Sequence, residues 1–213
     1  MPNKRIALSR LVISGYYSGL LLSVSKLLEQ ARRTSARAVN AVITATYWEV
    51  GRRIVEHEQR GESKAEYGIA LLKKLSVDLT ARFGRGFSER NLEQMRLFYT
   101  LWPISQTLSA KSIDREIPKT LSAQFTLHQL SVAFPLPWSH YVRLLSVKSP
   151  EARAFYESEA LRGGWSVRQL DRQIATQFYE RTAFSNNKVA MLTKGSKPKP
   201  GDKLTPEQEI KDP

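Results

Sequence analysis

A seven-residue pattern that could contact DNA bases occurs twice in the chain. Residues 86–92 read Gly-Phe-Ser-Glu-Arg-Asn-Leu and residues 164–170 read Gly-Trp-Ser-Val-Arg-Gln-Leu, so both share the order glycine, aromatic, serine, any residue, arginine, amide, leucine. Arginine can bind guanine through two hydrogen bonds, and the amide of asparagine or glutamine can do the same with adenine. The pattern therefore predicts two places at which side chains meet base edges.

The candidate nucleic-acid-binding residues lie at or just after these two patterns. They are Ser88, Arg90, Asn91, Gln94, Arg96, Ser166, Arg168, Gln169 and Arg172. The serines are expected to cap helices whose free amides and positive dipole ends attract phosphate. The arginines and amides are expected to face the groove, as in helix-turn-helix proteins.

The elements that position these side chains are predicted to be short turns between helices. Each pattern begins with a glycine that can end one helix and continues with a serine that can begin the next. Phe87 can pack against Leu92 as a hydrophobic staple, and Gln169 can return a hydrogen bond to Ser166 as a capping box. An alternative interpretation is a pair of well-capped helix hairpins whose arginines are only solvated surface.

No other part of the sequence has credible spacing for catalysis or metal binding. The three histidines, His57, His128 and His140, are isolated, so surface or capping roles are expected for them. The Glu209-Ile210-Lys211 run has no apolar strand around it and is interpreted as chance. We therefore expect no catalytic residue, metal or cofactor, although an enzyme with an unrecognised site remains a third alternative.

The composition restricts the partners and the compartment. A formal net charge of +13 over 213 residues attracts polyanions such as DNA, RNA and anionic lipid. The absence of cysteine fits a reducing, cytoplasmic environment. The uncharged stretch 11–25 is shorter than a membrane-spanning helix and is diluted by serine and glycine, so a docked helix is expected there.

The periodicity of apolar residues predicts a mostly α protein with two helix-turn-helix-like units. Helices are expected at about 18–33, 35–58, 64–83, 88–102, 138–145, 149–163 and 166–181. Gly61 is expected to end the second of them. The aromatic residues Tyr47, Trp48 and Trp138 are expected in the core. The predicted organisation is a helical domain at 18–103, a linker or irregular insertion at 104–133, a second unit at 134–183 and a disordered basic tail at 184–213. Short strands within 104–133 are left open.

Several motifs, in order, resemble a known bacterial family. The motifs are Asn40, Tyr47–Arg52, Tyr67-Gly68, the first pattern with Met95-Arg96 and Phe98-Tyr99, Trp138–Tyr141, Phe155-Tyr156, and the second pattern with Arg172–Ile174. Together they resemble the N-terminal region of YhcG-type proteins over about residues 18–183. Pro137 is a departure, because the family tends to have a serine there, so we expect this helix to lack its usual cap and still to form.

The resemblance implies a DNA-binding region that, in the family, is joined to a PD-(D/E)XK nuclease domain. The acidic metal ligands and catalytic lysine of that nuclease have no counterpart in this chain, so we expect no cleavage by this chain alone. The leading hypothesis is a module that binds double-stranded DNA, with a nuclease subunit or a second copy as further partners and no membrane association. The alternative is a protein-interaction or oligomerisation scaffold for a nuclease partner.

Overall fold

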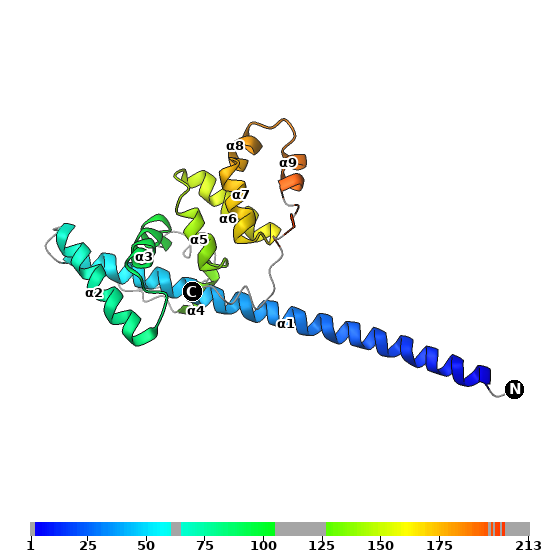
Figure 1. The fold of residues 1–213 in the computed structure, drawn as a ribbon. Coiled ribbons are helices and arrows are strands. Elements are labelled where there is room, and N and C mark those ends of the chain that lie inside the picture. The colour runs from blue at the N-terminus through cyan, green and yellow to red at the C-terminus, as the bar shows by residue number, and fades with distance from the viewer. Residues whose placement is uncertain are drawn as a thin grey trace, which may run out of the picture.

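The protein is built from helices packed around one core, as the computed structural model shows (Figure 1). The structure describes residues 3–60, 65–104, 127–195, 197, 199, 200 and 202, with side chains from Tyr16 onward except those of residues 60, 65–67, 128, 129 and 194. These residues contain no strand, so the mostly α prediction is confirmed. Within the same residues, no helix is both long enough and apolar enough to cross a membrane.

The first helix, α1 (Asn3–Arg60), is continuous where two helices had been expected. The predicted break near Ser35 does not occur because neither proline nor glycine lies there. Instead the Thr34 hydroxyl donates to the Gln30 carbonyl one turn earlier, 3.0 Å away, so this polar residue is accommodated inside the helix. The predicted stop at Gly61 lies outside the described residues.

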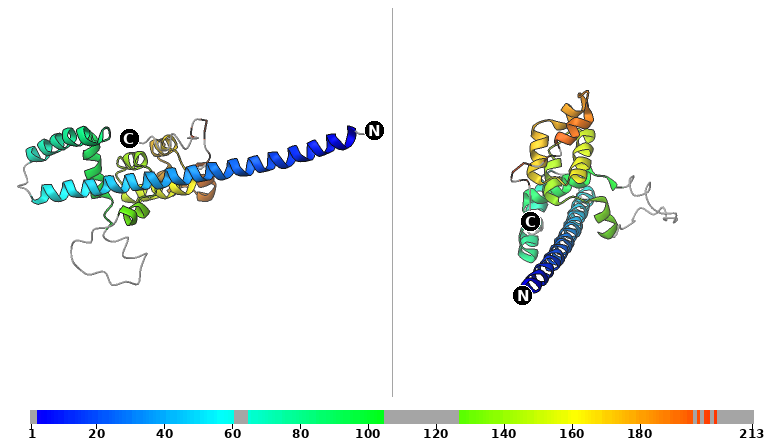
Figure 2. Two further views of the ribbon diagram at one scale, coloured as in Figure 1. Left: turned by 90° about the horizontal axis from the view of Figure 1, so that it is seen from below. Right: turned by 90° about the vertical axis from the view of Figure 1, so that its right-hand side faces the viewer.

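The N-terminal part of α1 extends from the body of the protein as an arm. Every described side chain from Tyr16 to Ser35 is exposed, and Ala36 is the first that is buried. The left view of Figure 2 shows from below that the arm runs clear of the other helices. The C-terminal half of α1 forms one wall of the core.

Two helices pack beside the C-terminal half of α1. The helix α2 (Ala65–Phe83) ends at Gly84, whose φ of 83° is in the left-handed region, and α3 (Glu89–Leu101) follows. The backbones of α1 and α3 approach so closely that a Cβ added to Gly51 would lie 2.0 Å from the Met95 carbonyl oxygen. Glycine is therefore required at this crossing.

The segment expected to be a linker contains a helix at its end. Residues 105–126 lie outside the described residues, but α4 (Leu127–Ala133) follows them and packs on α1. Leu130 of α4 is fully buried, and Ile104 and Phe134 are buried as well. The expectation of an irregular insertion over 104–133 is therefore wrong for this last part, where Leu130 anchors the chain in the core.

The second half of the chain contains five helices. They are α5 (Trp138–Leu144), α6 (Pro150–Gly163), α7 (Val167–Ala175), α8 (Phe178–Ala183) and α9 (Lys188–Gly195). Pro137 precedes α5 without a side-chain cap bond, and the helix forms nonetheless, as expected. The single helix predicted over 166–181 is interrupted at Gln177, whose φ is 50°. The Tyr156 hydroxyl supports this break by accepting from the Tyr179 N–H, 3.0 Å away.

The tail predicted to be disordered from residue 184 begins with an ordered helix. Met191 and Leu192 of α9 pack against the core, although the surrounding sequence is polar. Gly195 at its end lies against the Phe178 ring, where an added Cβ would be 2.2 Å from the ring. Met191 and Leu192, which lie one turn before Gly195, are thus enough to hold α9 against the core.

The core is a single cluster that includes both units predicted to be separate. Phe98 of α3 lies at its centre, with ring centroids 5.3 Å from Trp138 and 4.8 Å from Tyr141 of α5. Trp48 of α1 joins this group through Phe134, and the same cluster extends to Leu170. Tyr47, Trp48 and Trp138 are buried, as predicted. The two parts of the chain that were predicted as separate units therefore fold around shared apolar contacts.

Candidate nucleic-acid interface

Both repeated patterns form the capped helix starts that the sequence predicts. The Ser88 hydroxyl accepts from the Asn91 N–H at 3.3 Å, and the Ser166 hydroxyl accepts from the Gln169 N–H at 3.2 Å. Both serines have extended backbone conformations, as residues at a helix N-cap do. Trp165 before the second cap is 3% exposed. The two helices therefore begin in the same way.

The aromatic residue before the first cap packs more widely than a simple staple. Phe87 is half-buried against the core cluster that contains Leu92. Its ring also makes an edge contact with Tyr47 of α1, with centroids 6.4 Å apart, and lies 6.1 Å from Phe83 of α2. The start of α3 is thus fixed by contacts from two other helices.

Two of the predicted arginines are exposed and available. Arg90 and Arg168 are each the second residue of their helix, α3 and α7, and both side chains are exposed. No carboxylate among the described residues forms an ion pair with either guanidinium group. Each lies in the first helical turn, near the positive end of the helix dipole. They are the residues that best meet the sequence prediction.

The amide of the first pattern, Asn91, faces the protein. Its Nδ2 donates to the Gly86 carbonyl, and its Oδ1 accepts from the Trp138 indole N–H at 2.9 Å. Both ends of the amide are therefore occupied by internal partners. The prediction that Asn91 points outward to read adenine does not agree with this placement, because the side chain instead ties α3 to α5.

The amide of the second pattern, Gln169, is buried at 3% exposure. Its Nε2 donates to the Gly195 carbonyl at 3.2 Å, and Gln173 donates to the same carbonyl at 2.9 Å. No hydrogen bond joins the Gln169 side chain to the Ser166 backbone in this described region, so the expected capping box is half formed. The α9 helix covers this face of α7, which is why Gln169 faces inward.

The remaining predicted cations are paired with acids. Arg96 forms an ion pair with Glu58 at 2.9 Å, and Arg172 forms two hydrogen bonds with Asp202 at 2.8 and 3.1 Å. The hydrogen bonds from Arg172 hold the pKa of Asp202 below its usual value of 3.8. These two arginines therefore join segments of the fold. Gln94 is half-buried on α3 and has no such role assigned by the structure.

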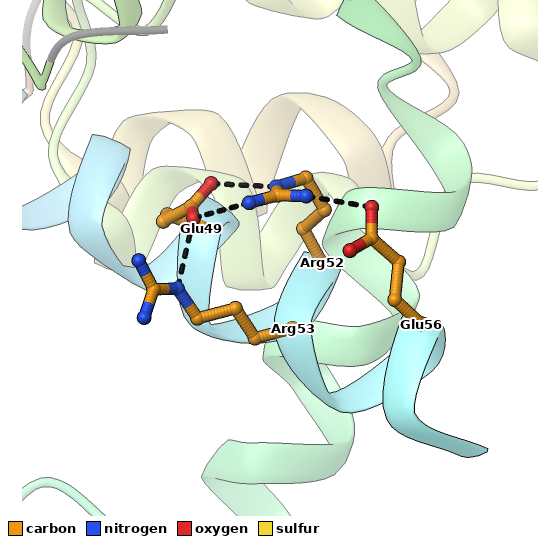
Figure 3. A network of polar contacts seen from close by, with 4 residues as sticks. All are labelled: Glu49, Arg52, Arg53 and Glu56. Carbon is orange, nitrogen blue, oxygen red and sulfur yellow. Dashed lines mark hydrogen bonds and ion pairs between the residues drawn. The ribbon is translucent and has the colours of Figure 1, made fainter. Parts of the chain in front are cut away.

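A further group of basic residues on α1 is also neutralised within the protein. Figure 3 shows Glu49 between Arg52 and Arg53, with Arg52 also contacting Glu56 at 2.6 Å. Burial favours a higher pKa for Glu49, but hydrogen bonds from Arg52 and Arg53 outweigh it and lower the pKa. These pairs have the i, i+3 and i, i+4 spacing of a helix face, so the sequence contained a signal for them. They add little positive potential to the surface.

The first turn of α5 connects the two patterns through contacts that no spacing in the sequence predicts. The Trp138 indole donates to Asn91 in the first pattern, and His140 Nε2 donates to the Trp165 carbonyl in the second, 2.8 Å away. Residues that are two positions apart in a helix point about 200° apart around its axis. Trp138 and His140 therefore reach to different sides of α5. His140 is 4% exposed, so the expected surface role is wrong.

Metal binding finds no support in the described part of the chain. No group of three or more histidine, aspartate, glutamate or cysteine side chains there could hold a metal ion. His57 is exposed on α1, and the side chain of His128 lies outside the described residues, as does the Glu209-Ile210-Lys211 run. The available chemistry at the two helix starts is therefore that of amides and guanidinium groups.

The sequence matches a known protein family and one curated relative. A family described as the DUF1016 N-terminal domain matches residues 23–181. The chain is 53% identical over 196 residues to the protein named "Putative nuclease YhcG" of Escherichia coli strain K12, a match that covers 88% of this chain and 52% of the relative. The chain thus spans about half the length of the curated relative that it matches. No solved structure is significantly similar to it.

Proposed function

The chain belongs to the DUF1016 N-terminal domain family, and we propose that it binds duplex DNA through Arg90 and Arg168. The observation that carries this proposal is that the same capped helix start occurs twice, each time with an exposed arginine as the second helical residue. The E. coli relative is named a nuclease. The role proposed for this chain is to hold DNA for such an activity, without a catalytic site of its own.

The chemistry of the two helix starts supports phosphate and base contacts. The first turn of a helix has N–H groups without intrahelical partners, and these attract phosphate oxygens. A guanidinium group in the same turn can bind either a phosphate or the edge of guanine. Arg90 and Arg168 have no acidic partner among the described residues to compete with these ligands.

The connection through α5 gives the two arginines a fixed spacing. Trp138 and His140 fix the start of α3 and the turn before α7 to a single helical turn. The ion pair between Arg143 of α5 and Asp171 of α7, at 3.5 Å, adds a further link. A fixed spacing between two contacts reduces the entropy lost when both engage a duplex. The net charge of +13 would increase the rate of association.

The test is a salt series of binding to mixed-sequence duplex DNA. Arg90→Ala plus Arg168→Ala is expected to weaken binding by about 30-fold or more, since each well-placed arginine contact contributes roughly 1–3 kcal/mol. If both arginines contact phosphate, the slope of log affinity against log salt falls by about two. Fluorescence anisotropy with a labelled duplex measures both quantities.

The matched control is Lys73→Ala plus Lys74→Ala. These two lysines are exposed on α2, so the control removes the same formal charge from another surface. It is expected to change the affinity by less than about threefold, the effect of altered long-range attraction. If both double variants weaken binding equally, or if wild-type binding does not depend on salt, the proposed interface is incorrect.

A further inference from the structure

The arm of α1 has a large apolar surface that the body of the protein does not cover. Among its exposed side chains, Leu20 is 62% exposed, Leu27 is 66% exposed and Leu28 is 56% exposed. Exposed apolar surface of this extent on one helix is typical of an interaction site. Figures 1 and 2 show the arm projecting away from the helices that form the core.

The apolar side chains lie on one face of the helix, which we call the arm stripe. At 100° per residue they fall within about one third of the circumference around Val24. The members of the arm stripe are Tyr17, Leu20, Leu21, Val24, Leu27, Leu28, Val39 and Val42, each at least 43% exposed. The stripe spans about seven turns, or nearly 40 Å.

The arm stripe is on the opposite side of α1 from the face that packs on the body. Ala36, Asn40 and Thr44 mark the buried face, and helical geometry places them between about 115° and 165° from the arm stripe. The stripe nevertheless continues beside them through Val39 and Val42. The helices that the structure describes pack on that opposite face and therefore leave the stripe uncovered.

The charges of the arm indicate which partner suits this face. Of the charged side chains of the arm, Lys26, Glu29, Arg33 and Arg37 lie on the opposite face, more than about 130° from the centre of the arm stripe, whereas Arg32 lies about 80° from that centre, at the edge of the stripe. Two arms that meet stripe to stripe would therefore keep most of their charges in water and far apart. A 3- and 4-residue spacing of apolar side chains is also the pattern by which helices pair with one another.

We propose that the arm stripe is covered by the arm of a second copy of this chain. Each large apolar side chain offers about 80 Å² of apolar surface, so the eight offer roughly 600 Å² per chain. This approaches the ~800 Å² per partner of a standard specific interface. One face that pairs with itself about a two-fold axis needs no second binding surface. The stripe continues through Val42 to the part of α1 that packs on the body of the protein. A partner helix can lie along this whole length more easily than a flat lipid surface can.

The test uses two single substitutions on the same helix. Leu27→Glu places a carboxylate in the arm stripe, whereas Leu22→Glu places one at an equally exposed position, 73%, on the opposite face. The wild-type chain is expected to sediment as two or more copies of its 24.2 kDa mass. Leu27→Glu is expected to weaken self-association by about a hundredfold or more, because each assembled pair would bury two carboxylates. Leu22→Glu should leave it unchanged.

Sedimentation equilibrium over a wide range of concentrations measures the association, and circular dichroism verifies that each variant is folded. Both leucines are exposed in the single chain, so neither substitution should disturb the core. A wild-type chain that is monomeric throughout would overturn the proposal, whether or not it binds lipid vesicles or another protein. Equal effects of the two substitutions, or none from Leu27→Glu, would overturn it as well.

Discussion

Replacing Asn91 by alanine distinguishes a structural amide from a base-reading one. The side chain accepts from the Trp138 indole N–H and donates to the Gly86 carbonyl. Trp138 is 3% exposed, so after the substitution its N–H has neither its partner nor ready access to water. Asn91→Ala is therefore expected to destabilise the fold, whereas Arg90→Ala, one residue earlier and exposed, is not.

The size of the effect follows from the two bonds. A buried donor left without a partner costs about 1–3 kcal/mol, and the half-buried bond to Gly86 contributes about 0.5–1.5 kcal/mol. Asn91→Ala should therefore lower the free energy of unfolding by about 2–4 kcal/mol. For a chain of this length that corresponds to a fall in Tm of roughly 5–15 °C.

Urea unfolding followed by tryptophan fluorescence measures the loss, and DNA binding is measured on the folded protein. Asn91→Asp keeps an acceptor for Trp138 but places a carboxylate oxygen against the Gly86 carbonyl, so this variant should destabilise the fold as well. Arg90→Ala should stay within about 0.5 kcal/mol of wild type. The reasoning is refuted if Asn91→Ala keeps full stability and weakens DNA binding.

Two further predictions concern packing and pH. Gly51→Ala forces a Cβ against the Met95 carbonyl and should lower the free energy of unfolding in urea by about 3 kcal/mol. Gly19→Ala is the matched control on the same helix: its Cβ meets no atom within 4 Å, so it should raise the free energy of unfolding by up to about 1 kcal/mol. Equal effects would contradict the close crossing of α1 and α3. Because pairing with Arg172 lowers the pKa of Asp202, the pair stabilises the fold above pH 3.8 and loses that contribution as pH falls through the lower folded value. Asp202→Asn should therefore be less stable than wild type at neutral pH, with the difference closing in acid; a constant difference would count against the pair.

Local signals in the sequence predicted the helix starts correctly. Ser88 and Ser166 cap their helices because the bond that each accepts comes from a residue only three positions later. Such contacts depend on a few neighbouring residues and on no tertiary partner. The same holds for Ser149, which accepts from the Ala152 N–H at 3.1 Å, and for Gly164, which ends α6 with φ of 58°.

The orientation of the side chains after these caps depended on distant partners. Asn91 is turned inward by Trp138, 47 residues away, and Gln169 by Gly195, 26 residues away. Nothing in the spacing of either pattern indicates those partners. The order of residues 188–195 was missed for a related reason, because only Met191 and Leu192 anchor a polar segment whose composition favours disorder.

The structure also explains why an arginine and an amide next to each other cannot both read bases here. Adjacent residues on a helix point about 100° apart, so a helix that buries one of them directs the other to its exposed side. In both patterns the amide is the internal anchor, and the arginine before it remains exposed. Under the proposed function each helix start then offers DNA one guanidinium group and its free backbone amides, of which only the guanidinium can distinguish bases. A duplex held in this way is bound strongly through its phosphates and weakly by its sequence, so the affinity should vary far more with salt than with the order of bases.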